Sequence, residues 1–223
     1  MRVLVTRPME DAKATAEILR ARGHAPVIAP LLEIRYREGI SLPFDDAAAI
    51  LATSANGIRA LARNTPRRDL HVFAVGARTA EVATQAGFTD VASADGDAAD
   101  LAGLVIASGW PKDAALLHAA GAETRGDLMA TLQREGYRVR SIALYDAFAA
   151  KEISCDLASI DAALFYSPRS AAVFARLAER APCERILACC ISAATAAALS
   201  PLVFREVRIA GRPDQESLLS LLG

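Results

Sequence analysis

The chain has 223 residues, of which 53% are hydrophobic, and its formal net charge at pH 7 is −1. The length suffices for two domains, and the near-neutral charge argues against nonspecific binding to nucleic acid or to anionic lipid, which both need a basic excess. No apolar run reaches about 18 residues, and the apolar run within Met1 to Pro8 is too short for a signal peptide, so we expect a cytoplasmic protein without a membrane segment.

The four cysteines are Cys155, Cys183, Cys189 and Cys190. They form no CxxC pair and have no histidines at zinc spacing, which disfavours both a disulfide scaffold and a structural metal site. We predict buried thiols in a reducing compartment.

The N-terminal part predicts a strand, a helix and two further extended segments. Residues 3–5 form a short apolar run, and residues 9–22 carry apolar side chains at helical spacing up to Gly23. Residues 24–30 predict a second strand. Residues 31–37 alternate between apolar and polar side chains, which is typical of a ribbon with one wet face.

The middle of the chain repeats a strand, a turn of small residues and a helix. Residues 47–51 predict a strand that runs into Thr53, Ser54 and a helix. Residues 72–75 predict the next strand, Gly76 permits a tight turn, and Thr79 lies in the first turn of a helix. The further elements expected here are a new unit starting at Asp45 and Asp46, strands at 90–92, 114–118 and 139–148, and helices at 101–107 and 127–134. The long strand at 139–148 contains Tyr145 and is predicted to pair with 31–37.

The last third of the chain follows the same pattern. The expected elements are strands at 161–165, 186–191 and 207–210, a turn at 166–170, a helix at 171–180, a helix after Ser192 through Thr195 to Leu199, and a terminal helix capped by Asp214. Residues 49–61 match residues 162–174, and each copy is followed by a second strand, turn and helix. We interpret this as an internal duplication.

Strands that alternate with helices predict the α/β class, with two similar doubly wound parallel-sheet domains that are flavodoxin-like or Rossmann-like. In such folds ligands bind at the carboxyl ends of strands, where helix N-termini expose amides that favour a carboxylate or a phosphate. We therefore expect one cleft between the domains, faced by Thr53, Ser54, Thr79, Ser167 and Thr195.

The candidate residues also have simpler structural explanations. Serine and threonine at helix starts are usually caps, but recurrence at matched places in two repeats makes a ligand role about as good an explanation. Arg7 suits either a surface ion pair or a bidentate carboxylate anchor, and Arg125 is similar. His24, His71 and His118 lie at no triad or metal spacing and are predicted to be structural. The sequence contains no GxGxxG, Walker or GxSxG motif.

Seven motifs occur in a fixed order over nearly the whole chain: Val5 to Pro8, Ala29 to Ile34, Thr53 to Gly57, Val75 to Ala80, Gly121 to Arg125, Tyr145, and Tyr166 to Ser170. Together they resemble the uroporphyrinogen-III synthase family of haem and tetrapyrrole biosynthesis. The resemblance implies two α/β domains, formed by residues 1–34 with 151–223 and by residues 45–143, and a linking two-stranded ribbon at 35–44 and 144–150.

The resemblance also implies a reaction. A lyase of this family cyclises hydroxymethylbilane to uroporphyrinogen III with loss of water and inversion of ring D, and it needs no cofactor and no metal. Because the bilane also closes unaided without inversion, the enzyme's task is largely to fold the substrate and select the closing carbon. The implied partner is this anionic linear tetrapyrrole, with no nucleic acid and no membrane, and we expect a monomer.

Tyr145 matches the family's tyrosine and is implied to be catalytic, through a hydrogen bond to the departing hydroxyl. The residues implied or predicted to bind substrate are Arg7, Thr53, Ser54, Asn56, Gly76, Thr79, Arg125, Ser167, Ser170 and Thr195. Three positions depart from the family's pattern, with Ser192 in place of glycine, Ala194 in place of threonine and Ala120 in place of arginine.

The alternative hypothesis is a noncatalytic two-lobed protein that binds or senses a small molecule, as periplasmic binding proteins and regulator domains do. It would share the two-lobed α/β form. The missing signal peptide and the presence of Tyr145 disfavour it.

Overall fold

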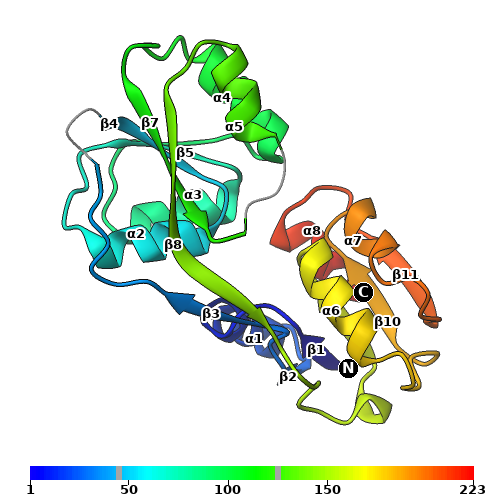
Figure 1. Cartoon of the computed structure of the whole chain (residues 1–223). Helices are drawn as coiled ribbons and strands as arrows, with labels where there is room; N and C mark the ends of the chain where they lie inside the picture. Colours follow the sequence, from blue (N-terminus) through cyan, green and yellow to red (C-terminus); the bar gives the residue numbers. More distant parts are fainter. Residues whose placement is uncertain (44–46, 124–126) are drawn as a thin grey trace. The chain divides into compact units, whose positions relative to one another are not determined.

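The computed structural model describes residues 1–43, 47–123 and 127–223. The chain divides into two compact units (Figure 1). Unit 1 comprises Met1–Glu33 and Phe148–Gly223, and unit 2 comprises Ile34–Ala147. The predicted start of a unit at Asp45 and Asp46 lies outside the described residues.

Unit 1 is built on a five-stranded parallel sheet with the strand order β11-β10-β9-β1-β2. Three of its strands are buried almost throughout, which explains why they appear in the sequence as unbroken apolar runs. The strands are β1 (Arg2–Val5), β2 (Ala25–Ile28), β9 (Ala162–Phe165), β10 (Leu187–Cys190) and β11 (Glu206–Ile209).

Helices cover both faces of this sheet. On one face Val3 and Val5 pack with Leu19 and Leu218, from α1 (Met9–Ala21) and α8 (Gln215–Leu219). On the other face Phe165 packs with Phe174, from α6 (Pro168–Leu177), and with Leu199, which follows α7 (Ala193–Ala197). Two short 3₁₀ turns, Leu157–Ser159 and Ser220–Leu222, complete the unit.

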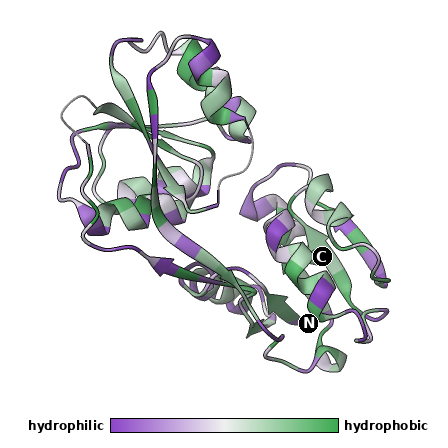
Figure 2. Cartoon of the chain, viewed as in Figure 1, coloured by the Kyte–Doolittle hydropathy of each residue, from purple (hydrophilic) through white to green (hydrophobic). Residues whose placement is uncertain are grey.

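Unit 2 holds most of a six-stranded sheet with the strand order β3-β8-β7-β4-β5-β6. Its strands are β3 (Leu32–Tyr36), β4 (Ala47–Ala52), β5 (His71–Ala74), β6 (Val91–Ser93), β7 (Ala115–Gly121) and β8 (Val139–Ala149). The neighbouring strands from β8 to β6 run parallel. Polar and apolar residues follow one another along β8, as the colours of Figure 2 show.

The sheet of unit 2 is also covered on both faces. Ile50 and Ala52 pack against α2 (Ala55–Asn64) and α3 (Ala77–Gln85). Leu51 of the same strand points the other way, toward α4 (Ala98–Ala107) and α5 (Leu128–Arg134). This alternation follows from the two-residue period of a strand and confirms the predicted doubly wound α/β class.

The predicted pairing of the two ribbon segments is confirmed, since β3 and β8 are neighbours. The N–H of Arg37 donates to the carbonyl oxygen of Leu144 at 2.8 Å, and the N–H of Ala150 donates to that of Leu31 at 2.9 Å. The residue numbers rise along β3 while those of the paired residues fall along β8, so the two strands run antiparallel.

Several details differ from the sequence predictions. The helix predicted at 171–180, after a turn at 166–170, spans Pro168–Leu177. The helix predicted to reach Leu199 ends at Ala197, three residues before Ser200, because Pro201 has no N–H to donate to the carbonyl oxygen of Ala197. Cys155 is half-buried rather than buried, whereas Cys183, Cys189 and Cys190 are buried as predicted. Burial raises the pKa of both Cys189 and Cys190 to about 12, which keeps these thiols protonated and unreactive.

Candidate active site

The turn after β4 brings the hydroxyl groups of Ser54 and Tyr145 together. Ser54 is the N-cap of α2, with extended backbone, and its Oγ accepts a hydrogen bond from the N–H of Gly57 at 3.1 Å. The same Oγ lies 2.9 Å from the hydroxyl oxygen of Tyr145 on β8. Because the cap uses Oγ as an acceptor, the Ser54 proton remains available to the tyrosine oxygen.

Gly121 sets the position of the Tyr145 ring. A Cβ built on Gly121 would lie 2.9 Å from both Cε2 and Cζ of that ring, which is closer than carbon atoms approach. The next residue, Ala122, donates its N–H to the carbonyl oxygen of Tyr145 at 2.8 Å. The carboxyl end of β7 therefore needs a glycine here so that the phenol can lie across it.

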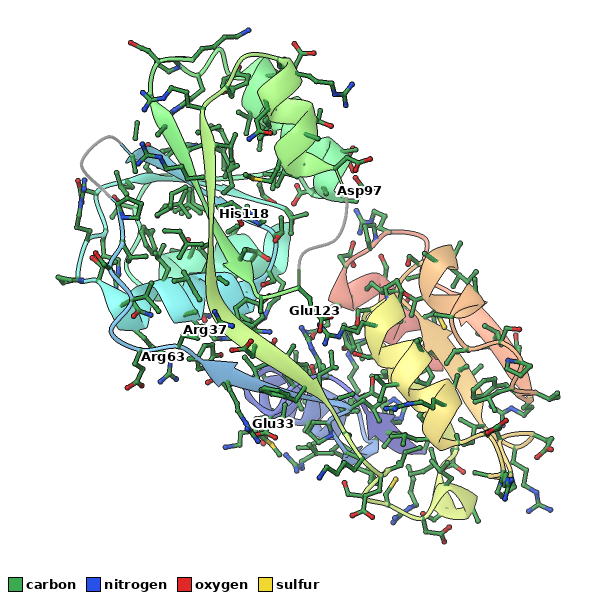
Figure 3. All side chains as sticks on the ribbon, viewed as in Figure 1. Glu33, Arg37, Arg63, Asp97, His118 and Glu123 are labelled. Carbon is green, nitrogen blue, oxygen red and sulfur yellow. The ribbon has the colours of Figure 1, made fainter. Side chains whose placement is uncertain are left out.

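Thr53 points to a different neighbour from Ser54. Its Oγ1 lies 3.1 Å from Nε2 of His118, and Nδ1 of the same imidazole lies 3.3 Å from Oγ of Ser141 (Figure 3 labels His118). His118 is only 3% exposed, and its burial lowers the pKa to about 4, so that it is neutral at pH 7. No motif or spacing in the sequence links these three residues.

The other candidates in unit 2 lie at the starts of α2 and α3. Asn56 accepts a hydrogen bond at its Oδ1 from the Arg59 guanidinium at 3.0 Å. Gly76 is the N-cap of α3 and has no side chain to cap it, but its carbonyl oxygen accepts the N–H of Thr79 at 2.9 Å. The Thr79 side chain is buried. Because β4 and β5 pair in parallel, α2 and α3 begin at the same end of the sheet.

In unit 1 the Arg7 guanidinium is occupied by partners of its own unit. Its Nη1 donates to Gln215 at 2.8 Å and to Thr15 at 3.2 Å, and its Nη2 lies 3.7 Å from a carboxylate oxygen of Asp11. The guanidinium carbon lies 4.0 Å from the centre of the Tyr166 ring, in a cation–π contact. Arg7 therefore has an ion pair, but the pair is largely buried and not at the surface as one of the two sequence explanations had it.

The two remaining turns of unit 1 have nearly identical caps. Ser167 accepts the N–H of Ser170 at 3.1 Å, and the two hydroxyl oxygens lie 3.0 Å apart. Ser192 accepts the N–H of Thr195 at 3.3 Å, again with the hydroxyls 3.0 Å apart. The side chains of Ser170 and Thr195 are buried, and their hydroxyls contact the capping serines directly.

The candidate Arg125 lies outside the described residues. Within the described ranges, no three histidine, cysteine, aspartate or glutamate side chains gather as a metal ion would need. No helix in the same ranges is both long enough and apolar enough to cross a membrane.

Comparison with known proteins identifies the family. Residues 13–220 match the family model described as uroporphyrinogen-III synthase HemD. A stretch of 58 residues is 38% identical to a protein of Methanocaldococcus jannaschii named provisionally as a uroporphyrinogen-III synthase; this stretch is 26% of the present chain and 24% of that relative.

Two solved structures support the fold. The uroporphyrinogen-III synthetase of Helicobacter pylori 26695 has a TM-score of 0.67 and 18% identity, with 100% of this chain and 98% of that chain covered. A mutant uroporphyrinogen III synthase of the extremely thermophilic bacterium Thermus thermophilus has a TM-score of 0.56 and 18% identity, with 100% and 97% covered. With the family model spanning most of its length, the chain belongs to the uroporphyrinogen-III synthase family of haem and porphyrin biosynthesis.

Proposed function

We propose that this protein cyclises hydroxymethylbilane to uroporphyrinogen III, with loss of water and inversion of ring D, and so acts as a lyase. The observation that carries the proposal is the 2.9 Å contact between the Tyr145 and Ser54 hydroxyls at the carboxyl end of the unit 2 sheet. Membership of the family supplies the reaction, and this pair supplies a proton donor suited to its first step.

In that step the carbon–oxygen bond of the hydroxymethyl group breaks, and the hydroxyl takes a proton from Tyr145 and leaves as water. The remaining azafulvene-type cation closes onto the substituted carbon of ring D and gives a spiro intermediate. The bond from that carbon to its original methylene bridge then breaks, and the freed methylene bonds to the unsubstituted α carbon of ring D, which loses its proton. The proton that the cyclised product releases restores the tyrosine. No oxidant or metal enters this balance.

An isolated tyrosine, with an ordinary pKa near 10, is a weak acid at pH 7, so the contribution of Ser54 is to hold the Tyr145 hydroxyl in place. Oγ of Ser54 accepts from Gly57 and lies 2.9 Å from the tyrosine oxygen, so it can donate its own proton to that oxygen when the tyrosine gives its proton to the substrate. That hydrogen bond stabilises the oxygen as its proton leaves, and it frees the phenolic proton for the substrate.

The substrate is an octacarboxylate, and we propose that its carboxylates bind at the turns that end the parallel strands. In unit 2 the proposed contacts are Thr53, Asn56, Gly76 and Thr79, at the N-termini of α2 and α3, where exposed amides favour an anion. We retain Arg7, Ser167, Ser170 and Thr195 of unit 1, and Arg125, as proposed contacts. Because the Nη groups of Arg7 already bond within unit 1, Arg7 would attract the substrate mainly through its charge.

The test is incubation of the purified protein with freshly prepared hydroxymethylbilane, followed by chromatographic separation of the isomers. Uroporphyrinogen III in excess over isomer I, against a protein-free sample that yields isomer I, is the expected result. Isomer I alone, together with saturable binding of the bilane, would favour the noncatalytic alternative.

A further inference from the structure

Two neighbouring residues of one turn are held from two sides. Oγ1 of Thr53 contacts Nε2 of His118 at 3.1 Å, while Oγ of the next residue, Ser54, contacts the Tyr145 hydroxyl at 2.9 Å. The two contacts come from different strands, His118 from β7 and Tyr145 from β8, so they restrain adjacent residues of the turn independently. A shift of Thr53 would carry Ser54 with it.

His118 lies at the centre of three paired strands. On β7 it is opposite Leu51 of β4 and opposite Ser141 of β8, to which its Nδ1 bonds at 3.3 Å. Thr53 follows Leu51 by two residues, and Tyr145 follows Ser141 by four. The imidazole thus connects the strand that ends at the turn with the strand that carries the proposed proton donor.

An apolar side chain would fill this position at a lower desolvation free energy than a histidine. Withdrawing a polar group from water costs several kcal/mol unless hydrogen bonds replace those lost, and His118 is 3% exposed. Both of its ring nitrogens have a hydroxyl partner, so that one nitrogen donates and the other accepts in either neutral tautomer. The fold therefore retains two directional bonds where packing alone requires none.

We propose that His118 is a positioning residue, which fixes the Thr53–Ser54 turn through Thr53 so that Ser54 holds the Tyr145 hydroxyl in place. It touches no reacting atom. This inference rests on the proposed function, because its effect on catalysis passes through Tyr145. Its effect on the turn itself is independent of the reaction.

Two substitutions of similar size separate the two bonds of the imidazole. The amide of glutamine reaches the place of Nε2, so His118→Gln retains a partner for Thr53. The shorter amide of asparagine reaches only the place of Nδ1, so His118→Asn retains a partner for Ser141 and loses Thr53. Because asparagine is also one methylene smaller than glutamine, the control for packing is Thr53→Val, which leaves the imidazole in place and removes only its bond to Thr53.

The first readout is the exchange rate of the Gly57 amide hydrogen, which NMR measures without substrate. That amide donates to Ser54, so its protection reports how firmly the turn is held. We expect exchange about 10-fold faster in His118→Asn and little change in His118→Gln. Should His118→Asn not fold, Thr53→Val removes the same bond from the other end and must give the same acceleration.

The second readout is steady-state turnover of hydroxymethylbilane. His118→Asn should lower kcat about 10-fold with KM little changed, since a donor aligned for the leaving group acts in the transition state, and His118→Gln should recover most of kcat. Equal losses in both variants, or unchanged Gly57 exchange in His118→Asn, would overturn the proposal. If the wild-type protein forms no isomer III, the proposed function fails, while Gly57 exchange still decides whether His118 holds the turn.

Discussion

The hydroxyl oxygens of Ser54 and Tyr145 lie 2.9 Å apart although 91 positions separate the two residues in the chain. Two features of the fold bring them together. Strands β4 and β8 both pair with β7, and Gly121 at the end of β7 leaves space for the phenol ring. Substitutions at the individual residues therefore test each part of this arrangement separately.

Gly121→Ala should displace the Tyr145 ring without unfolding the protein. The new methyl group would meet Cε2 and Cζ of the ring at 2.9 Å, and a side chain can rotate away where backbone cannot. We expect turnover to fall about as far as in Tyr145→Phe, while the unfolding free energy changes by less than about 1 kcal/mol. Activity at the wild-type level would show that the ring position does not matter.

Gly57→Ala should destabilise unit 2, because its Cβ would meet the carbonyl oxygen of Ala119, which is backbone and cannot rotate away. We expect a loss of about 2 to 3 kcal/mol in urea unfolding, as for other overpacked sites. The matched control is Gly103→Ala in α4, where a Cβ meets nothing within 4 Å. That change should stabilise the protein by about 0.5 to 1 kcal/mol. Equal effects at the two sites would argue against close packing of α2 on β7.

Acid should destabilise the protein through His118 before most carboxylates titrate. Its pKa is about 4 in the folded protein and 6.5 in an unfolded chain, so between these values the unfolded state binds the proton more readily. The contribution of His118 to the unfolding free energy is complete above pH 6.5 and is lost as the pH falls toward 4. About 2 kcal/mol of it is lost between pH 7 and pH 5.

The control for this pH dependence is His118→Gln, which keeps every other titrating group. Urea unfolding of both proteins at pH 7 and pH 5 isolates the histidine. The loss of unfolding free energy between pH 7 and pH 5 should be smaller in His118→Gln than in the wild type, by most of about 2 kcal/mol. Parallel pH profiles would mean that His118 is protonated as readily when folded as when unfolded.

Ser54→Ala should lower both stability and activity. Loss of an N-cap costs about 1 kcal/mol, and Tyr145 also loses its hydroxyl partner. Asp97→Ala is a matched control, since Asp97 caps α4 through the N–H groups of Ala99 and Asp100, on an element that does not carry the tyrosine. Both variants should lose similar unfolding free energy, but only Ser54→Ala should lose turnover. Equal turnover in the two variants would remove Ser54 from the mechanism.

The local pattern of the sequence predicted the elements well because each depends on near neighbours. The apolar runs of β9 and β10 are buried strands, and Ser54, Ser167 and Ser192 are N-caps with similar backbone angles. Those caps bond to residues three positions later, which is a signal within reach of a single sequence.

The contacts that define the site come from residues far apart in the chain, which local patterns do not specify. His118 is 65 positions from Thr53 and 23 from Ser141, and Arg7 is 208 from Gln215. His118 was predicted from the sequence to be structural, but its position beside Thr53 depends on strand order. The need for Gly121 likewise arises only once Tyr145 lies across β7. The expectation that the turns of both domains face one cleft stays a prediction.

The most direct measurement is the steady-state rate of Tyr145→Phe with hydroxymethylbilane, together with its ratio of isomers III and I. Phenylalanine keeps the ring and removes only the hydroxyl that contacts Ser54, so folding should be retained. A single positioned donor contributes at most about 10²- to 10⁴-fold, and an electron-rich pyrrole expels its hydroxyl readily, so we predict a loss of about 100-fold or less. An unchanged rate would contradict the assignment of Tyr145 as the proton donor, and complete inactivity of a folded variant would contradict the view that positioning of the substrate supplies most of the catalysis.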